Sequence, residues 1–334
     1  MTSRERVQRA IHFGSPDRLP HFLPDGEDND IVWLWFPRPA PRQEWTNRGD
    51  TDTMIDSWGT TYRRVAGGVI GRGEVLVPGL PDIVKQGEYE LPDMLAPEFF
   101  DDAKRRIADN AASDNPKYVI GVLPYSSLNE GTHNVMGIEN MFLAYYEAPD
   151  DLKAFIGRLA AKQAEAIRLM AELGCDGVMG YDDWGLQDRL MIGLYMIEEF
   201  FMPHYRHNWL LAHNLGMDVW LHSCGHITAL LPRFIEAGLD VIQMDQQENM
   251  GLEELDACAG GKIAFWCPVD IQKTMINGTP EDVACYVQRM MKTLGAHNGG
   301  LISMAYTTPQ DVNHSAENMA AMCKAFREYG VYEA

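Results

Sequence analysis

A histidine and a cysteine stand two positions apart at the end of an apolar run of the sequence. His222 and Cys224 follow residues 219–221, which are Val, Trp and Leu. Side chains alternate between the two faces of an extended strand, so the imidazole of His222 and the sulfur of Cys224 would converge on one side. Imidazole nitrogen and thiolate sulfur are ligands that zinc prefers. The pair therefore predicts two points of a metal site.

Two later apolar runs end in further candidate ligands. Asp245 closes one of these runs, and Cys267 closes the next. If the runs are successive strands, His222, Cys224 and Cys267 form a ligand set typical of catalytic zinc. Asp245 could then occupy or release the fourth position. In the alternative interpretation, Cys267 is a buried strand residue and His222 is a barrel histidine satisfied by hydrogen bonds. Asp245 then caps a turn or orients the histidine.

Acidic side chains follow two other apolar runs. Asp182 and Asp183 come directly after one run, and the polar stretch after another contains Glu130 and His133. Paired acids can supply a general acid or base, because the charge of one carboxylate makes the other more basic. His133 could contact a substrate near the same mouth. Asp183 could instead cap the next turn, and Glu130 and His133 could each be loop surface.

The segment 25–41 is rich in Pro, Asp and Trp and lacks the periodicity of a core element. We expect it to be an irregular loop over the mouth of a barrel. Trp33 and Trp35 of this segment could bind an apolar or aromatic substrate, or they could pack in the core.

After residue 116, short β-rich apolar runs alternate with helical periodicity to the end of the chain. The expected strands span residues 118–123, 177–181, 218–222, 241–244, 263–266 and 301–305. The expected helices span residues 150–173, 195–215, 227–237, 280–294 and 315–329. Two more strands from the first 80 residues would give eight units. This count favours a single (β/α)8 barrel of the α/β class, with residues 1–334 as one domain.

The N-terminal part adds elements before the regular alternation. Thr2 and Ser3 are candidate caps of an amphipathic helix that buries Val7 and its neighbours. Residues 18–23 read as a short strand, and the glycine-punctuated stretch 62–77 reads as a strand or hairpin.

The charge balance limits the partners of the protein. The 28 Lys and Arg residues against 48 Asp and Glu residues give a formal net charge of −20. This charge disfavours nucleic acid and anionic membrane surfaces as partners. The N-terminus has no apolar signal region and no stretch is apolar enough to span a membrane, so we expect a cytoplasmic protein.

Seven motifs together carry a resemblance to a known family. They are SRERV (3–7), PDRLP (16–20), DDWG (182–185), HSCGHI (222–227), VDIQ (269–272), GTPEDV (278–283) and ENMAAM (317–322). In their order and spacing they resemble the uroporphyrinogen decarboxylase superfamily along nearly the whole chain. The resemblance independently implies a (β/α)8 barrel.

The superfamily contains two chemistries, and the motifs separate them. Its metal-free decarboxylases carry the arginine-rich segment RQAGR after the first strand, whereas this chain has LPDGED at 23–28. Acidic groups there would repel a polycarboxylate tetrapyrrole. The zinc-dependent corrinoid methyltransferases carry H-x-C on one strand, which His222 and Cys224 match. In the coenzyme M methyltransferases the last cysteine lies on the final strand, but residues 302–306 contain none, so Cys267 is expected to replace it.

The resemblance implies a zinc-dependent methyltransferase that moves a methyl group from a methoxylated, aromatic substrate to the cobalt of a corrinoid carried by a partner protein. Zinc would act as a Lewis acid on the ether oxygen, while Asp182, Asp183 or Glu130 protonates the departing oxygen. Trp33 and Trp35 would cover the substrate. The alternatives are a methylcobalamin:thiol methyltransferase of the coenzyme M type and a metal-free enzyme of the decarboxylase kind.

Overall fold

The chain forms two compact units in the computed structural model, which describes residues 1–67, 73–307 and 309–332. The barrel unit comprises residues 1–35, 103–122 and 167–334. The second unit comprises residues 36–102 and 123–166. Each unit is considered by itself below.

The barrel unit is built on one sheet of eight strands, all paired in parallel. The strands are β1 (His21–Phe22), β2 (Ile31–Leu34), β7 (Tyr118–Val122), β8 (Gly177–Tyr181), β9 (Asp218–His222), β10 (Val241–Gln243), β11 (Ala264–Cys267) and β12 (Leu301–Met304). Their order is β1-β12-β11-β10-β9-β8-β7-β2, and a parallel bridge between His21 and Asn29 joins the two ends. The predicted (β/α)8 barrel is confirmed.

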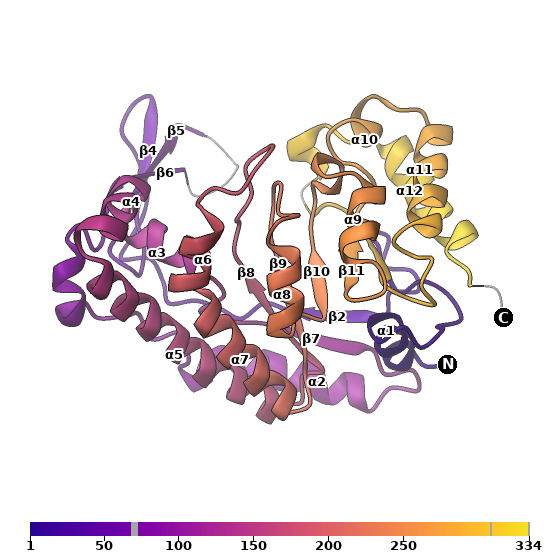
Figure 1. Ribbon diagram of the computed structural model, residues 1–334, viewed down its shortest axis with the longest axis horizontal. Coiled ribbons are helices and arrows are strands. Elements are labelled where there is room, and N and C mark those ends of the chain that lie inside the picture. Colours follow the sequence, from indigo (N-terminus) through magenta and orange to yellow (C-terminus); the bar gives the residue numbers. More distant parts are fainter. Residues whose placement is uncertain (68–72, 308, 333–334) are drawn as a thin grey trace. The chain divides into compact units, whose positions relative to one another are not determined.

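Helices alternate with these strands along the chain. They are α1 (Ser3–Ile11), α2 (Asp101–Ala111), α3 (Asn129–Met136), α4 (Ile138–Glu147), α5 (Pro149–Leu173), α6 (Leu194–Phe200), α7 (Met202–Asn214), α8 (Leu231–Ala237), α9 (Leu252–Ala259), α10 (Thr274–Asn277), α11 (Pro280–Lys292) and α12 (Ala316–Tyr329). In the barrel unit, α7 packs on β9, and α8 packs against both α7 and α9 (Figure 1). Among the described residues, no helix combines the length and the apolar character needed to cross a membrane.

Local sequence signals explain where several helices begin. The Thr2 side chain accepts a hydrogen bond from the Glu5 amide, as expected for the cap of α1. Thr279 and Asp282 form a reciprocal capping box at the start of α11. The expected helix 195–215 is instead two helices, because Pro203 lacks an amide hydrogen and fits only the first turn of α7.

The interior of the barrel is filled by every second side chain of its strands. The cluster contains Val7, Ala10, Ile11, Ile31, Tyr118, Ile120, Val122, Met179, Trp220, Val241, Ala264, Trp266, Ile302 and Met304. The apolar face of α1 belongs to it, as the periodicity predicted. The Gly300 amide, just before β12, donates to the Ala10 carbonyl, so α1 covers the amino-terminal end of the barrel. The carboxyl-terminal end is left for the loops that carry chemistry.

The segment 25–41 is not irregular throughout. Its residues 31–34 form β2, a barrel strand that pairs with β7. The expectation failed because the Ile-Val-Trp-Leu run is only four residues long and lies between Asp-rich and Pro-rich sequence. Trp33 is therefore a strand residue whose ring packs against the barrel core.

The second unit contains an antiparallel sheet, which the sequence predicted only in part. Its order is β3 (Gln43–Asn47), β4 (Thr51–Ile55), β5 (Thr61–Val65), β6 (Glu74–Val77). The expected hairpin within 62–77 is the β5–β6 pair, and residues 68–72 of that expectation lie outside the described chain. Helices α3 and α4 were not expected as helices; Gly137, with φ of 79°, separates them.

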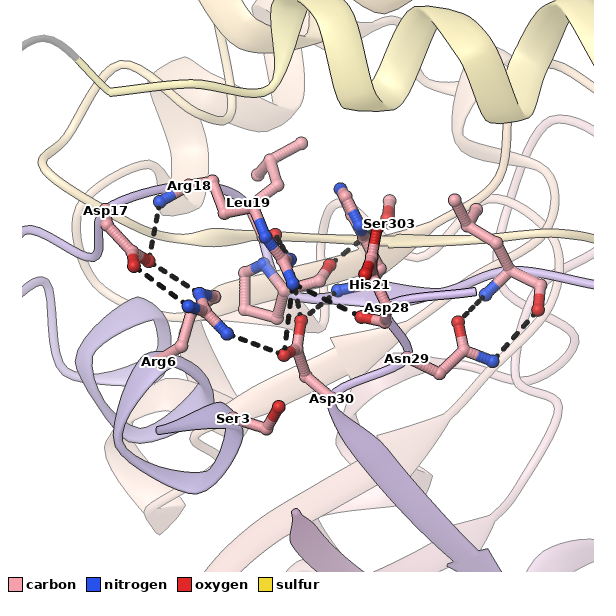
Figure 2. Close-up of polar contacts among 12 residues, drawn as sticks. Ser3, Arg6, Asp17, Arg18, Leu19, His21, Asp28, Asn29, Asp30 and Ser303 are labelled. Carbon is pink, nitrogen blue, oxygen red and sulfur yellow. Dashed lines mark hydrogen bonds and ion pairs between the residues drawn. The ribbon is translucent and has the colours of Figure 1, made fainter. Parts of the chain in front are cut away.

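A buried carboxylate joins the ends of the barrel sheet. Asp30 precedes β2 and is fully buried. Its oxygens lie 2.7 Å from Arg6 Nη1 and 2.8 Å from Arg18 Nη1, and the His21 amide donates to it at 2.8 Å. Figure 2 shows both guanidinium groups directed at Asp30. Burial, assisted by the charge of Arg18, lowers the pKa of His21 to about 4, so its ring adds no third positive charge at neutral pH.

We expect Asp30→Ala to lower the free energy of unfolding by about 3–5 kcal/mol, because it leaves two largely buried guanidinium groups without their shared partner. Denaturant unfolding monitored by circular dichroism measures this change. The neighbouring exposed Glu27 provides the control, and Glu27→Ala should change the free energy by no more than about 0.5 kcal/mol. Equal effects of the two substitutions would contradict the role given to Asp30.

Candidate metal centre

Three neighbouring strands bring polar or aromatic side chains to one level at their carboxyl ends. Tyr181 ends β8, His222 ends β9 and Gln243 ends β10. In the sheet register His222 pairs with Tyr181 on one side and with Gln243 on the other. Trp220 belongs to the barrel core, so His222, two residues later, faces the barrel interior as well.

The structure gathers Asp183, His222 and Cys224 into one cluster of half-buried groups. One ligand atom of each lies within 4.8 Å of the others. His222 Nε2 is 3.3 Å from Asp183 Oδ1 and 3.4 Å from Cys224 Sγ. The predicted convergence of His222 and Cys224 is therefore present. Asp183, expected as an acid of the reaction, lies with them.

Hydrogen bonds between two loops hold Asp183 and Cys224 together. The Cys224 amide donates to Asp183 Oδ1 at 2.7 Å, and the Gly185 amide donates to the Cys224 carbonyl at 3.1 Å. Gly225 has φ of 78°, and a Cβ atom there would overlap the Gly185 carbonyl oxygen. Only glycine allows this close approach. Gly185 of the DDWG motif and Gly225 of the HSCGHI motif therefore serve the same contact between the two loops.

His222 and the groups around it have displaced pKa values. Burial alone lowers the pKa of His222, but its contacts with Asp183 and Cys224 outweigh burial and raise the pKa well above its usual range. Burial raises the pKa of the Cys224 thiol, and His222 opposes this shift only in part. Burial also raises the pKa of Asp245. His222 and Cys224 therefore carry protons that a bound cation would displace.

The donor set of this cluster fits zinc. It offers one carboxylate oxygen, one imidazole nitrogen and one sulfur, all of which zinc accepts in catalytic sites. A tetrahedral zinc ion with bonds of about 2.0–2.3 Å sets its ligand atoms roughly 3.3–3.8 Å apart. The distances of 3.3 and 3.4 Å from His222 Nε2 agree with this requirement.

Cys267 and Asp245 are not among the described groups that form this cluster. Cys267 ends β11 and is fully buried; Trp266 before it belongs to the barrel core, so Cys267 lies on the opposite face of the strand. Asp245 accepts a hydrogen bond of 3.0 Å from Gln243. The ligand roles of Cys267 and Asp245 stay predictions.

The remaining predicted residues lie in different settings. Asp182 is buried and accepts a hydrogen bond from the Tyr205 hydroxyl of α7. Glu130 and His133 are half-buried residues of α3 in the second unit. Their roles in catalysis and substrate binding also stay predictions.

An aromatic row extends from the cluster along the neighbouring strands. The ring of Tyr181 lies 5.1 Å from that of His222 and 5.3 Å from that of Trp35, measured between centroids. Trp35 is 5.4 Å from Trp33 and is 49% exposed. Rings in such contact present a large, partly exposed apolar surface beside the metal-ligand candidates.

Sequence reasoning missed Gln243, which touches His222 directly. Gln243 Oε1 lies at hydrogen-bond distance from His222 Nδ1, and its Nε2 donates to Asp245 and to Met304 Sδ. A signal was present, because Gln243 is the polar residue of the run Val-Ile-Gln-Met and stands two positions before Asp245. That spacing places both on one face of a strand.

Comparisons with known proteins bear on the family of the chain. Among solved structures, a methyltransferase from Methanosarcina mazei is similar, with a TM-score of 0.68 and 12% identity over 98% of this chain and 99% of that one. The D-psicose 3-epimerase from Clostridium cellulolyticum H10 has a TM-score of 0.43 and 13% identity over 68% and 83% of the two chains. No curated protein matches the sequence. Residues 126–329, more than half of the 334, match the family described as uroporphyrinogen decarboxylase (URO-D). The chain therefore belongs to the uroporphyrinogen decarboxylase family.

Proposed function

We propose that the protein is a zinc-dependent methyltransferase that moves a methyl group from a methoxylated aromatic compound to the cobalt of a corrinoid protein. The observation that carries the proposal is the cluster of Asp183, His222 and Cys224 at the carboxyl ends of β8 and β9. The similarity of the whole barrel to a methyltransferase agrees with it. The corrinoid protein and the methylated compound are the proposed partners.

The segment after β1 favours methyl transfer over decarboxylation of a polycarboxylate. Residues 23–28 contain no basic side chain. Arg327, which reaches this segment, already forms a two-point ion pair with Asp25 at 2.8 and 2.9 Å. A polyanionic substrate would therefore meet carboxylates there, whereas a neutral ether would not be repelled.

In the proposed reaction the carbon–oxygen bond of the ether breaks and a carbon–cobalt bond forms with the electron pair of cobalt(I). The oxygen leaves with the electrons of the broken bond and takes up a proton. When bound by Asp183, His222 and Cys224, zinc would supply a Lewis acid for that oxygen. Tyr181 and Trp35 would hold the aromatic ring of the substrate beside the cluster. The proton is assigned to Asp182 of the barrel unit, and Asp182→Asn tests this assignment.

The first expected outcome concerns metal content. Wild-type protein purified without oxygen should contain about one zinc per chain, and Cys224→Ala should lose most of it, because two remaining ligands hold zinc poorly. Elemental analysis measures the content. Cys258→Ala, in the half-buried cysteine of α9, is the control and should keep its zinc. Wild-type occupancy in Cys224→Ala would reject the site.

The same measurement identifies the third ligand. If Asp183 is the third ligand, Asp183→Ala should lose zinc and Cys267→Ala should keep it. The opposite result would show that zinc is held by the two cysteines and the histidine, as the sequence alone suggested.

Zinc affinity should rise with pH. The raised pKa values of His222 and Cys224 mean that both groups carry protons at neutral pH, and zinc must displace them. Between pH 6 and 8 the affinity should therefore rise by about 10- to 100-fold per pH unit, for one or two protons displaced. Competition with a chelator of known pH dependence measures it. A flat profile would contradict protonation of these ligands.

Activity tests the methyl transfer itself. With a reduced corrinoid protein and a panel of methoxylated aromatics, wild-type protein should convert cobalt(I) absorbance into that of methylcobalt, and His222→Ala should lower the rate by about 100-fold or more. Cys285→Ala, at an exposed cysteine of α11, should match wild type. Consumption of methylcobalt by added thiol, with no ether turned over, would instead support the coenzyme M type of reaction.

A further inference from the structure

Gln243 contacts the ring nitrogen of His222 that lies opposite the cluster. We infer that Gln243 is a positioning residue, which holds the Nδ1 proton of His222, so that the proton on Nε2 is the one that a bound metal displaces. The inference rests on the proposed metal site and names a residue that acts through one of its ligands. Asp245 and Met304 contact Gln243 and orient its amide.

The orientation of the Gln243 amide follows from its two other neighbours. Its Nε2 lies 3.0 Å from Asp245 Oδ1 and 3.1 Å from Met304 Sδ. A thioether sulfur has no hydrogen to donate in any state, and a carboxylate only accepts. The NH2 end of the amide must therefore face this pair. The amide oxygen is left to face His222 Nδ1.

An amide oxygen can only accept, so His222 Nδ1 must donate its hydrogen to Gln243. A neutral imidazole carries one N–H group, and the other nitrogen keeps its lone pair. That other nitrogen is Nε2, which lies 3.4 Å from Cys224 Sγ and 3.3 Å from Asp183 Oδ1. The contact at Nδ1 thus selects the tautomer in which Nε2 can bind a metal together with its two neighbours.

A rotated amide would have the opposite effect. If the NH2 end of Gln243 faced His222, Nδ1 would have to accept, and the neutral ring would carry its proton on Nε2. The lone pair would then point away from Asp183 and Cys224. Asp245 and Met304 oppose this rotation, because each would lose the hydrogen it now accepts.

The placement of Gln243 agrees with such a role. Its side chain is 4% exposed and lies in the register of the sheet beside His222 on β9 and Trp266 on β11. Burying an amide costs free energy unless its groups are hydrogen-bonded. Here both ends of the amide have partners: His222 Nδ1 donates to the amide oxygen, and the amide nitrogen donates to Asp245.

The test compares zinc affinities of three variants by competition with a chelator. Gln243→Met has nearly the same shape and no acceptor, and should lower zinc affinity by about 10- to 100-fold. Gln243→Glu keeps an acceptor for the Nδ1 hydrogen and should lower it by less than about tenfold. Gln247→Met is the matched control, because Gln247 is equally buried but binds Pro268 and Tyr286 rather than His222. Its affinity should equal that of wild type.

A second measurement separates positioning from a loss of packing. Nitrogen-15 spectra of histidine-labelled, zinc-loaded protein should show a slowly exchanging proton on Nδ1 of His222, identified as the signal that His222→Gln lacks. In Gln243→Met, saturated with zinc, this proton should exchange rapidly. Melting temperatures of Gln243→Met and Gln247→Met show whether the affinity loss exceeds any shared loss of stability.

The outcomes distinguish this inference from the proposed function. Unchanged affinity in Gln243→Met, or a proton on Nε2 of the zinc-loaded wild-type ring, would overturn the positioning role while leaving the metal site intact. Reduced affinity restored by Gln243→Glu, with no methyl transfer to any corrinoid, would support the positioning role and overturn the proposed reaction. A wild-type protein that binds no zinc would overturn both.

Discussion

Strands β1 and β2 run parallel and are joined by only residues 23–30, which is too short for the helical crossover that normally links parallel strands. This connection is therefore too short to contain a helix that covers the junction of the two strands. A bridge between His21 and Asn29 closes the ring of strands. Asp30 replaces the missing packing by binding Arg6 of α1, Arg18 before β1 and the His21 backbone at once. A buried charge with several partners fixes directions that apolar contact alone would leave free.

Closure of the ring has a consequence at the other end of the strands. In a closed parallel barrel the carboxyl ends of neighbouring strands meet around one mouth, at levels that the register fixes. Here the register sets Tyr181, His222 and Gln243 side by side, and the loops that follow two of these strands supply Asp183 and Cys224. The cluster thus joins the H-x-C pair to Asp183, which lies 41 positions before Cys224, without any further local metal-binding motif.

The sequence predicted those parts of the molecule that depend on the periodicity of apolar residues and on local composition. Strands 177–181 and 218–222 were located to the residue, because each short apolar run lies between clear helical stretches. β2 was missed because four apolar residues inside polar sequence carry too little signal. The H-x-C pair was found from its spacing, because side chains two residues apart in one strand lie on the same face. Asp183 and Gln243 could not be assigned their places, because their distances to His222 depend on the register between strands and on the Gly185–Gly225 contact.

At the mouth, polar side chains occupy interior positions of the barrel that apolar side chains could fill. Elsewhere the interior consists of aliphatic and aromatic side chains, and at the levels of Trp220 and Trp266 the rings meet at 5.4 Å. Burying a leucine or methionine side chain at position 243 would cost less free energy than burying an amide, because both ends of the amide must find hydrogen-bond partners. The amide is compatible with folding only because Asp245, Met304 and His222 satisfy it, and each of these is itself partly withdrawn from water. Such a connected polar chain inside an apolar core departs from the rule that the other strands obey. Departures of this kind concentrate at functional sites, where the orientation of one group matters more than the stability it costs. In this barrel the chain ends at His222 Nε2, the atom that lies between a carboxylate and a thiol.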